Sequence, residues 1–105
     1  MQRSKVETFI GFSIRAKKLI AGANAIRESK GLYLMFVCNT ASENSQKDAL
    51  KIAKSKGIPL VLIKKGTAED LVLRANCKMF AIADKDLAKA IEANLDENFE
   101  VIFNK

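Results

Sequence analysis

The chain has 105 residues, of which 49% are hydrophobic and 29% are charged, and its formal net charge is +6. This length and composition are typical of one soluble globular domain spanning residues 1–105 and exclude a chain of two domains. The sequence has no histidine, no apolar run as long as a membrane span and no leader-like start, so we expect a cytoplasmic binding protein with no catalytic residues.

The first half of the chain predicts two helices followed by a strand. Apolar residues recur at three- and four-residue spacing over residues 4–20, which indicates an amphipathic helix with Ser4 as its N-cap. Gly22 ends this helix, and a short second helix follows over residues 23–29. The continuous apolar run at residues 32–38 predicts a strand that is buried on both faces.

The second half alternates helices and strands. Thr40 and Glu43 form a capping-box pattern that opens a helix reaching Lys56, and Gly57 stops it. The remaining expected elements, in chain order, are a strand at 59–63, a turn at 64–66, a helix beginning at 67–70, a strand at 78–83, a helix capped by Asp84 and reaching Asn94, and residues 99–103 as an edge strand or surface tail within a C-terminal segment of about 96–105. This alternation predicts a three-layer α-β-α sandwich around a small mixed sheet.

Basic residues concentrate in the first part of the chain. Residues 1–65 contain 13 Lys and Arg against 4 Asp and Glu, whereas residues 66–105 contain 5 against 8. This asymmetry favours a polyanionic partner for one side of the molecule, although a solvated lysine-rich surface would produce the same count. The same ambiguity holds for the stripe formed by Lys47, Lys51 and Lys54, which more often serves solubility.

The segment from Arg15 to Asn24 is the strongest candidate site. It places the cations Arg15, Lys17 and Lys18 before a turn at Gly22 and an asparagine at the next helix start, an arrangement that suits phosphates and a base edge. Asn24 could instead cap that helix. The cysteines, Cys38 and Cys77, lie in apolar segments without metal-ligand spacing, so we expect buried thiols rather than a disulfide or a metal site.

Several short segments resemble the superfamily of kink-turn-binding ribosomal proteins (large-subunit types seven-A and thirty), and in particular its bacterial YlxQ-like branch. The resemblance extends over nearly the whole chain up to about Ile91. The matching residues are Gly11, Arg15, Ala16, residues 18–20, Gly22, residues 41–44, residues 57–59, residues 81–84 and residues 87–89.

The resemblance implies a three-layer α-β-α sandwich that binds structured RNA. In the family, a glycine and an asparagine at a helix start contact guanines of sheared G·A pairs, and these positions correspond to Gly22 and Asn24 here. A loop that cups a flipped-out nucleotide corresponds to about residues 74–79, which brings in Arg74 and Lys78. The chain departs from the family at Ala25, where the kink-turn binders have a glutamate.

One further departure concerns the short second helix. Glu28 occupies the position of a family lysine, with Arg27 beside it as a substitute cation. We therefore expect an RNA-binding protein of the ribosome or of a structured RNA, with no cofactor, metal or small-molecule substrate. The alternative is a protein-interaction module in which the same fold has lost its RNA surface.

Overall fold

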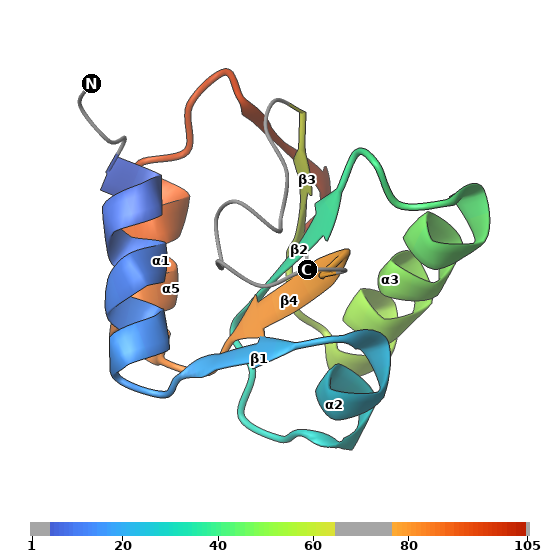
Figure 1. Ribbon diagram of the computed structural model, residues 1–105, viewed down its shortest axis with the longest axis horizontal. Helices are drawn as coiled ribbons and strands as arrows, with labels where there is room; N and C mark the ends of the chain where they lie inside the picture. The colour runs from blue at the N-terminus through green and yellow to red at the C-terminus, as the bar shows by residue number, and fades with distance from the viewer. Residues whose placement is uncertain (1–4, 65–76, 105) are drawn as a thin grey trace.

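The computed structural model describes residues 5–64 and 77–104 (Figure 1). Within these residues it contains helices α1 (Lys5–Arg15), α2 (Ala23–Glu28), α3 (Glu43–Lys56) and α5 (Lys85–Ala93), and strands β1 (Leu19–Ala21), β2 (Leu34–Cys38), β3 (Leu60–Ile63), β4 (Met79–Ile82) and β5 (Phe99–Phe103). The strands form one sheet in the order β1-β4-β2-β3-β5. Only the β2–β3 pair is parallel within this sheet, so the sheet is mixed, as predicted.

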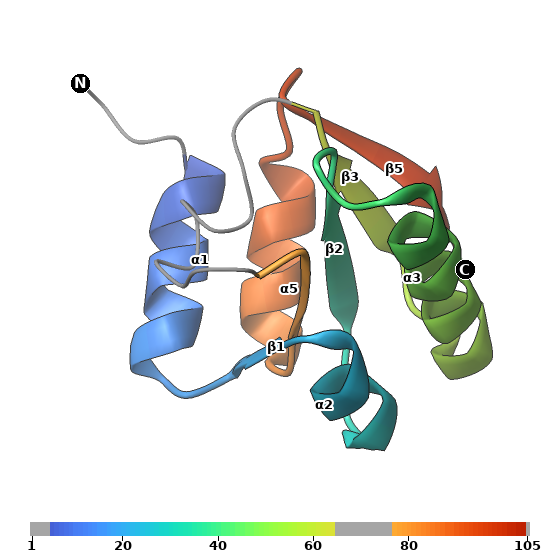
Figure 2. The same ribbon diagram turned by 45° about the vertical axis from the view of Figure 1, so that its right-hand side comes forward.

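Two helical layers cover the sheet (Figure 2). Helices α1 and α5 pack on one face over a core that contains the stacked rings of Phe36 and Phe80, whose centroids lie 4.8 Å apart. Helices α2 and α3 pack on the other face, where Ile26 and Ile52 meet the opposite side chains of β2 and β4. The α/β sandwich predicted from the alternating elements is therefore confirmed.

The expected helix over residues 4–20 is wrong in its last turn. Helix α1 ends at Arg15, and Lys17 adopts a left-handed conformation with φ of 59°. The Lys17 N–H donates to the Ile14 carbonyl at 3.1 Å and the Lys18 N–H to the Ser13 carbonyl at 2.8 Å, the two bonds of a Schellman ending. The following residues then form β1, which pairs antiparallel with β4.

Most other boundaries follow the sequence prediction. Gly57 ends α3 with φ of 65°, and the Asp84 carboxylate caps α5 by accepting from the Leu87 N–H at 2.9 Å. The expected capping box at Thr40 is wrong, because the N-cap is Ser42, whose hydroxyl accepts from the Ser45 N–H at 3.1 Å.

The structure also tests the predictions for the C-terminal segment and for the two cysteines. Residues 99–103 form the edge strand β5, which pairs with β3. Cys38 and Cys77 are buried and form no disulfide. Residues 65–76, which contain most of the turn expected at 64–66 and the helix expected from 67, lie outside the described residues.

Candidate nucleic-acid interface

Helix α2 begins at a glycine whose backbone shape is required there. Gly22 has φ of 94° and ψ of 147°, a conformation that L side chains rarely adopt. A Cβ added at this position would meet no atom within 4 Å, so the glycine is needed for its conformation and not to make room for a neighbour. The Gly22 N–H donates to the Met79 carbonyl at 3.0 Å, which ties the start of α2 to the start of β4.

This bond brings two predicted site residues together from distant parts of the sequence. Ala21 pairs with Phe80 in the antiparallel β1–β4 register, so Gly22 lies beside the segment that contains Lys78. The Lys78 carbonyl accepts from the Cys38 N–H at 2.8 Å, and its ammonium donates to the Thr40 hydroxyl at 3.2 Å. The end of β1, the end of β2 and the start of β4 thus meet at one end of the sheet.

Asn24 and Arg27 interact with each other on α2. The Arg27 guanidinium donates to Asn24 Oδ1 at 3.1 Å and to Asp48 Oδ2 of α3 at 2.8 Å. Asn24 does not cap the helix, because the N-cap is Gly22 and it makes no side-chain capping bond. The Asn24 carbonyl oxygen already accepts one bond from Arg27, so Asn24 has one acceptor site and the two N–H groups of its amide to offer a ligand.

Asp48 is a site residue that the sequence did not reveal. It lies 21 positions after Arg27 and on a different helix, and only the packing of α2 against α3 brings the two charges into contact. Both side chains are about half exposed, at 45% for Arg27 and 49% for Asp48. The pair is therefore open to solvent and can be exchanged for a ligand at small cost.

The other predicted cations lie at the opposite end of β1. The Lys18 carbonyl accepts from the Ala83 N–H at 2.7 Å, beyond the last residue of β4. The Arg15 guanidinium lies 4.9 Å from the ring centroid of Phe12. A three-residue strand separates Lys18 from Gly22, so their Cα atoms are about 13 Å apart at the usual rise per residue. Arg74 lies outside the described residues.

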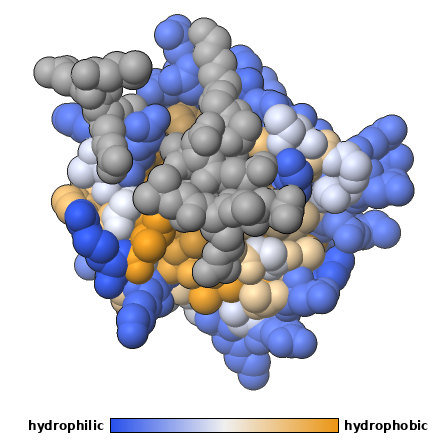
Figure 3. Space-filling model, in the orientation of Figure 1, coloured by the Kyte–Doolittle hydropathy of each residue, from blue (hydrophilic) through white to orange (hydrophobic). Residues whose placement is uncertain are grey.

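The seven predicted site residues that the structure describes thus form two clusters rather than one patch. We call Gly22, Asn24 and Lys78 the α2 cluster, to which Arg27 is joined through Asn24, and Arg15, Lys17 and Lys18 the α1 cluster. Strand β1 lies between them, and its three side chains are only partly buried. Figure 3 shows hydrophobic side chains over this strand and hydrophilic ones toward the edges of the molecule.

Two further features of the described residues concern a metal site and a membrane-spanning helix. No group of three His, Cys, Asp or Glu residues in the described part of the chain is arranged to hold a metal ion. None of the helices within residues 5–64 and 77–104 is long and apolar enough to cross a membrane.

Comparisons with known proteins define the fold and no more. No family model matches the chain, and no curated protein matches its sequence. Among solved structures, the chain is similar to a protein of unknown function from Bacillus halodurans C, with a TM-score of 0.79 and 17% sequence identity. The match covers 90% of this chain and 100% of that one, so the α/β sandwich occurs in both proteins over nearly their whole length.

Proposed function

We propose that the protein binds structured RNA, of the ribosome or of another folded RNA, through a surface that runs from the α1 cluster across β1 to the α2 cluster. The observation that carries the proposal is the bond from the Gly22 N–H to the Met79 carbonyl, because it places the start of α2, which contains Asn24, beside the start of β4, which Lys78 precedes. The resemblance to the kink-turn-binding superfamily implies RNA contacts at Gly22 and Asn24 and in the loop that contains Lys78. The proposed protein is cytoplasmic and has no catalytic role.

Each cluster would contribute a different part of recognition. In the α2 cluster, the glycine lets a sugar-phosphate backbone approach closely, the Asn24 amide donates to an acceptor on a base edge, and Lys78 adds charge. In the α1 cluster, Arg15, Lys17 and Lys18 are exposed and would neutralise phosphates. Because the clusters are about 13 Å apart, the ligand must be a folded or helical RNA that reaches both.

The missing carboxylate at position 25 affects which base edge is recognised. A glutamate there would accept hydrogen bonds from guanine donors, whereas Ala25 offers only a methyl group. The Asn24 carbonyl oxygen already accepts from Arg27. The α2 cluster therefore presents mainly donors, which favours acceptor groups such as guanine O6 and N7 or phosphate oxygens.

A second candidate function is a protein-interaction module. It is favoured by the edge strand β5, on which Val101 and Ile102 are 44% and 39% exposed. An edge strand with exposed apolar side chains is suited to pairing with a strand of another protein. In that case the Arg27–Asp48 ion pair would be a permanent contact between two helices.

The experiment that tests the proposal is a binding titration of a kink-turn RNA and of a straight duplex of equal length, at several salt concentrations. We expect preference for the bent RNA and a steep loss of affinity with salt, about one log unit per log unit of salt for each phosphate contacted. The double variant Asn24→Ala, Lys78→Glu should lose this preference, whereas Lys89→Glu on α5 is the matched control. Equal binding to both RNAs would mean that the protein binds RNA only through a nonspecific basic surface.

Two further outcomes separate the candidates. Charge reversal of Lys17 and Lys18 should abolish RNA binding and leave capture of a protein partner intact. An absence of binding to either RNA at low salt would reject the RNA proposal in favour of the protein-interaction module.

A further inference from the structure

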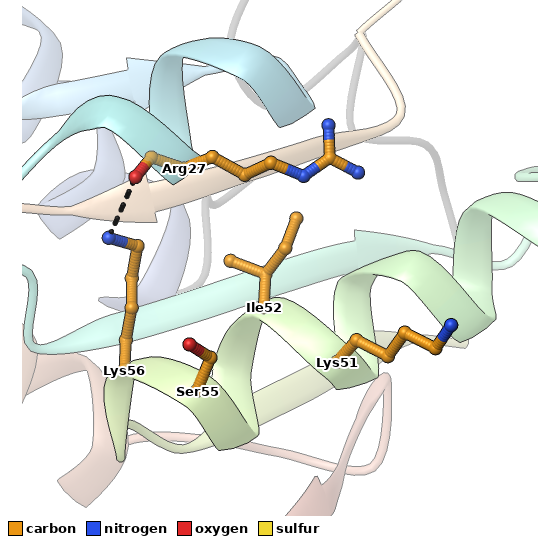
Figure 4. A pocket seen from close by; sticks show the side chains of 5 residues that line it. All are labelled: Arg27, Lys51, Ile52, Ser55 and Lys56. Atoms are coloured by element: carbon orange, nitrogen blue, oxygen red, sulfur yellow. Dashed lines mark hydrogen bonds between the residues drawn. The ribbon is translucent and has the colours of Figure 1, made fainter.

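A groove lies between α2 and α3, next to the α2 cluster but outside the residues singled out for RNA binding, apart from Arg27. It has a volume of about 290 Å³ and is lined by Arg27, Lys51, Ile52, Ser55 and Lys56. Figure 4 shows the Ile52 side chain pointing from α3 toward Arg27, so that the groove has an apolar floor beneath a guanidinium. Three of the five lining side chains are cations, and none is a carboxylate.

Lys56 fixes the two walls of this groove relative to each other. Its ammonium donates to the Arg27 carbonyl in the last turn of α2 at 3.2 Å and to the carbonyl of the C-cap Ser29 at 2.7 Å. An ammonium has three N–H donors, so one remains for a ligand after these two bonds. The cation is thus held in place before any ligand arrives, which reduces the entropy lost on binding.

A second hollow lies next to the groove. That hollow, of about 220 Å³, is lined by Ser29, Lys30, Gly31, Leu32 and Lys56, so the two share Lys56. Lys30 adds another exposed cation to this side. We call the two neighbouring hollows together the track; their lining extends from Arg27, beside the α2 cluster, to Lys30 and Gly31 past the end of α2.

The carboxylates near the track are largely neutralised. Residues 23–56 contain six Lys and Arg against three Asp and Glu. Asp48 is paired with Arg27 at 2.8 Å, and Glu43 is paired with Lys47 at 3.4 Å along α3. The third carboxylate, Glu28, is exposed on α2 and does not line either hollow. The track therefore has a clear excess of positive charge.

We propose that the groove between α2 and α3 is a binding site for phosphate groups. Lys51, Lys56 and the Ser55 hydroxyl would donate to the phosphate oxygens, and the Arg27 guanidinium would turn from Asp48 to the ligand. The source of the phosphates follows from the proposed function, on which this part of the inference rests: the backbone of the bound RNA leaves the α2 cluster and follows the track.

The test compares three groove variants with controls in the same RNA titration. Lys51→Glu and Ser55→Asp place negative charge in the groove, and Lys51→Ala removes one cation; Lys89→Glu on α5 is the control on the opposite helical layer. We expect roughly tenfold weaker binding at low salt for each charge-introducing variant and a salt slope lowered by about one for Lys51→Ala. Lys89→Glu should change affinity less than twofold, and thermal melts should show that all variants are folded.

A second readout separates this inference from the proposed function. Inorganic pyrophosphate is titrated into the ¹⁵N-labelled protein, and the amide signals of Ser55 and Lys56 are compared with those of α5. Saturable shifts at Ser55 and Lys56 that disappear in Lys51→Glu support the phosphate site. If these shifts occur but no RNA binds, the ligand of the site is a free phosphate compound and not RNA. The groove inference is overturned if the groove variants keep RNA binding and pyrophosphate causes no shift. The RNA function still stands in that case if the double variant Asn24→Ala, Lys78→Glu loses RNA binding.

Discussion

Replacing Asp48 by asparagine should strengthen RNA binding. The Asp48 carboxylate accepts from the Arg27 guanidinium at 2.8 Å and so competes with any phosphate that Arg27 would contact. Because both side chains are about half exposed, the ion pair contributes only about 0.2–1 kcal/mol to folding, and its loss should leave the protein folded. The same substitution removes one negative charge from the edge of the phosphate track.

The size of the effect follows from the geometry. A phosphate oxygen about 3 Å from the guanidinium nitrogen that contacts Asp48 would lie up to about 6 Å from the Asp48 oxygen, given the 2.8 Å distance between that nitrogen and Asp48. In water, two like charges at about 6 Å repel by about 0.7 kcal/mol, and screening at 0.1 M salt reduces this to about 0.4 kcal/mol. Asp48→Asn should therefore bind RNA about two- to threefold more tightly, with the larger gain at low salt.

Fluorescence anisotropy with labelled RNA at low and moderate salt measures this change. Asp86→Asn is the matched control, because Asp86 is an exposed carboxylate in the first turn of α5, on the opposite helical layer. If Asp48→Asn weakened binding, Asp48 would be positioning Arg27 for the ligand rather than competing with it. If Asp86→Asn gave the same gain, the effect would come from net charge and not from this pair.

Three further predictions concern the fold. Lys17→Gly should raise the free energy of unfolding by about 1 kcal/mol, and the melting temperature by about 4–8 °C, because glycine adopts the left-handed conformation of this residue without strain; a fall in melting temperature would contradict the Schellman ending. Asp84→Ala should cost about 1 kcal/mol in urea unfolding by removing the α5 cap, whereas Asp84→Asn should retain most of the stability. Cys38 and Cys77 should react with a thiol reagent only in denaturant, and fast labelling of the native protein would contradict their burial.

The parts of the fold that the sequence predicted well are those with local signals. The apolar run at residues 32–38 is enough to identify β2, because every residue of that strand is buried. Gly57 and Asp84 mark helix ends through their own backbone or side-chain chemistry, and the structure has both in those roles. Each of these signals depends on residues within a few positions of one another.

The boundary between α1 and β1 lacked such a signal. Helices often end at a glycine in the left-handed conformation, but here the residue in that conformation is Lys17. Leu19 and Ile20 also continue the apolar spacing of the helix, and a short apolar segment fits a helix or a strand equally well. Residues 19–21 form a strand rather than a last helical turn because they pair with β4, which lies about sixty residues further along the chain.

The arrangement of the candidate site has the same non-local origin. The resemblance assigned Gly22 and Asn24 to one segment and Lys78 to a separate loop, and the antiparallel register of β1 and β4 is what places the two segments side by side. Asp48 had no distinguishing signal, since an acidic residue on an exposed helix face is ordinary in sequence. Its effect on Arg27 exists only because α2 packs against α3.

The strand at residues 19–21 changes what the proposed interface would require of its ligand. If the helix had continued to Ile20, Lys18 would lie about one turn and Arg15 about two turns from Gly22, so the cations of the α1 cluster would lie closer to Gly22 than they do. With β1 in between, Lys18 and Gly22 are separated by about 13 Å, and the surface joining them consists of partly buried apolar side chains. A ligand that contacts both clusters must therefore place phosphates at the two ends of β1 and less charged parts over its middle. Under the RNA proposal, a bent RNA that turns bases toward the protein between two runs of phosphates meets this requirement.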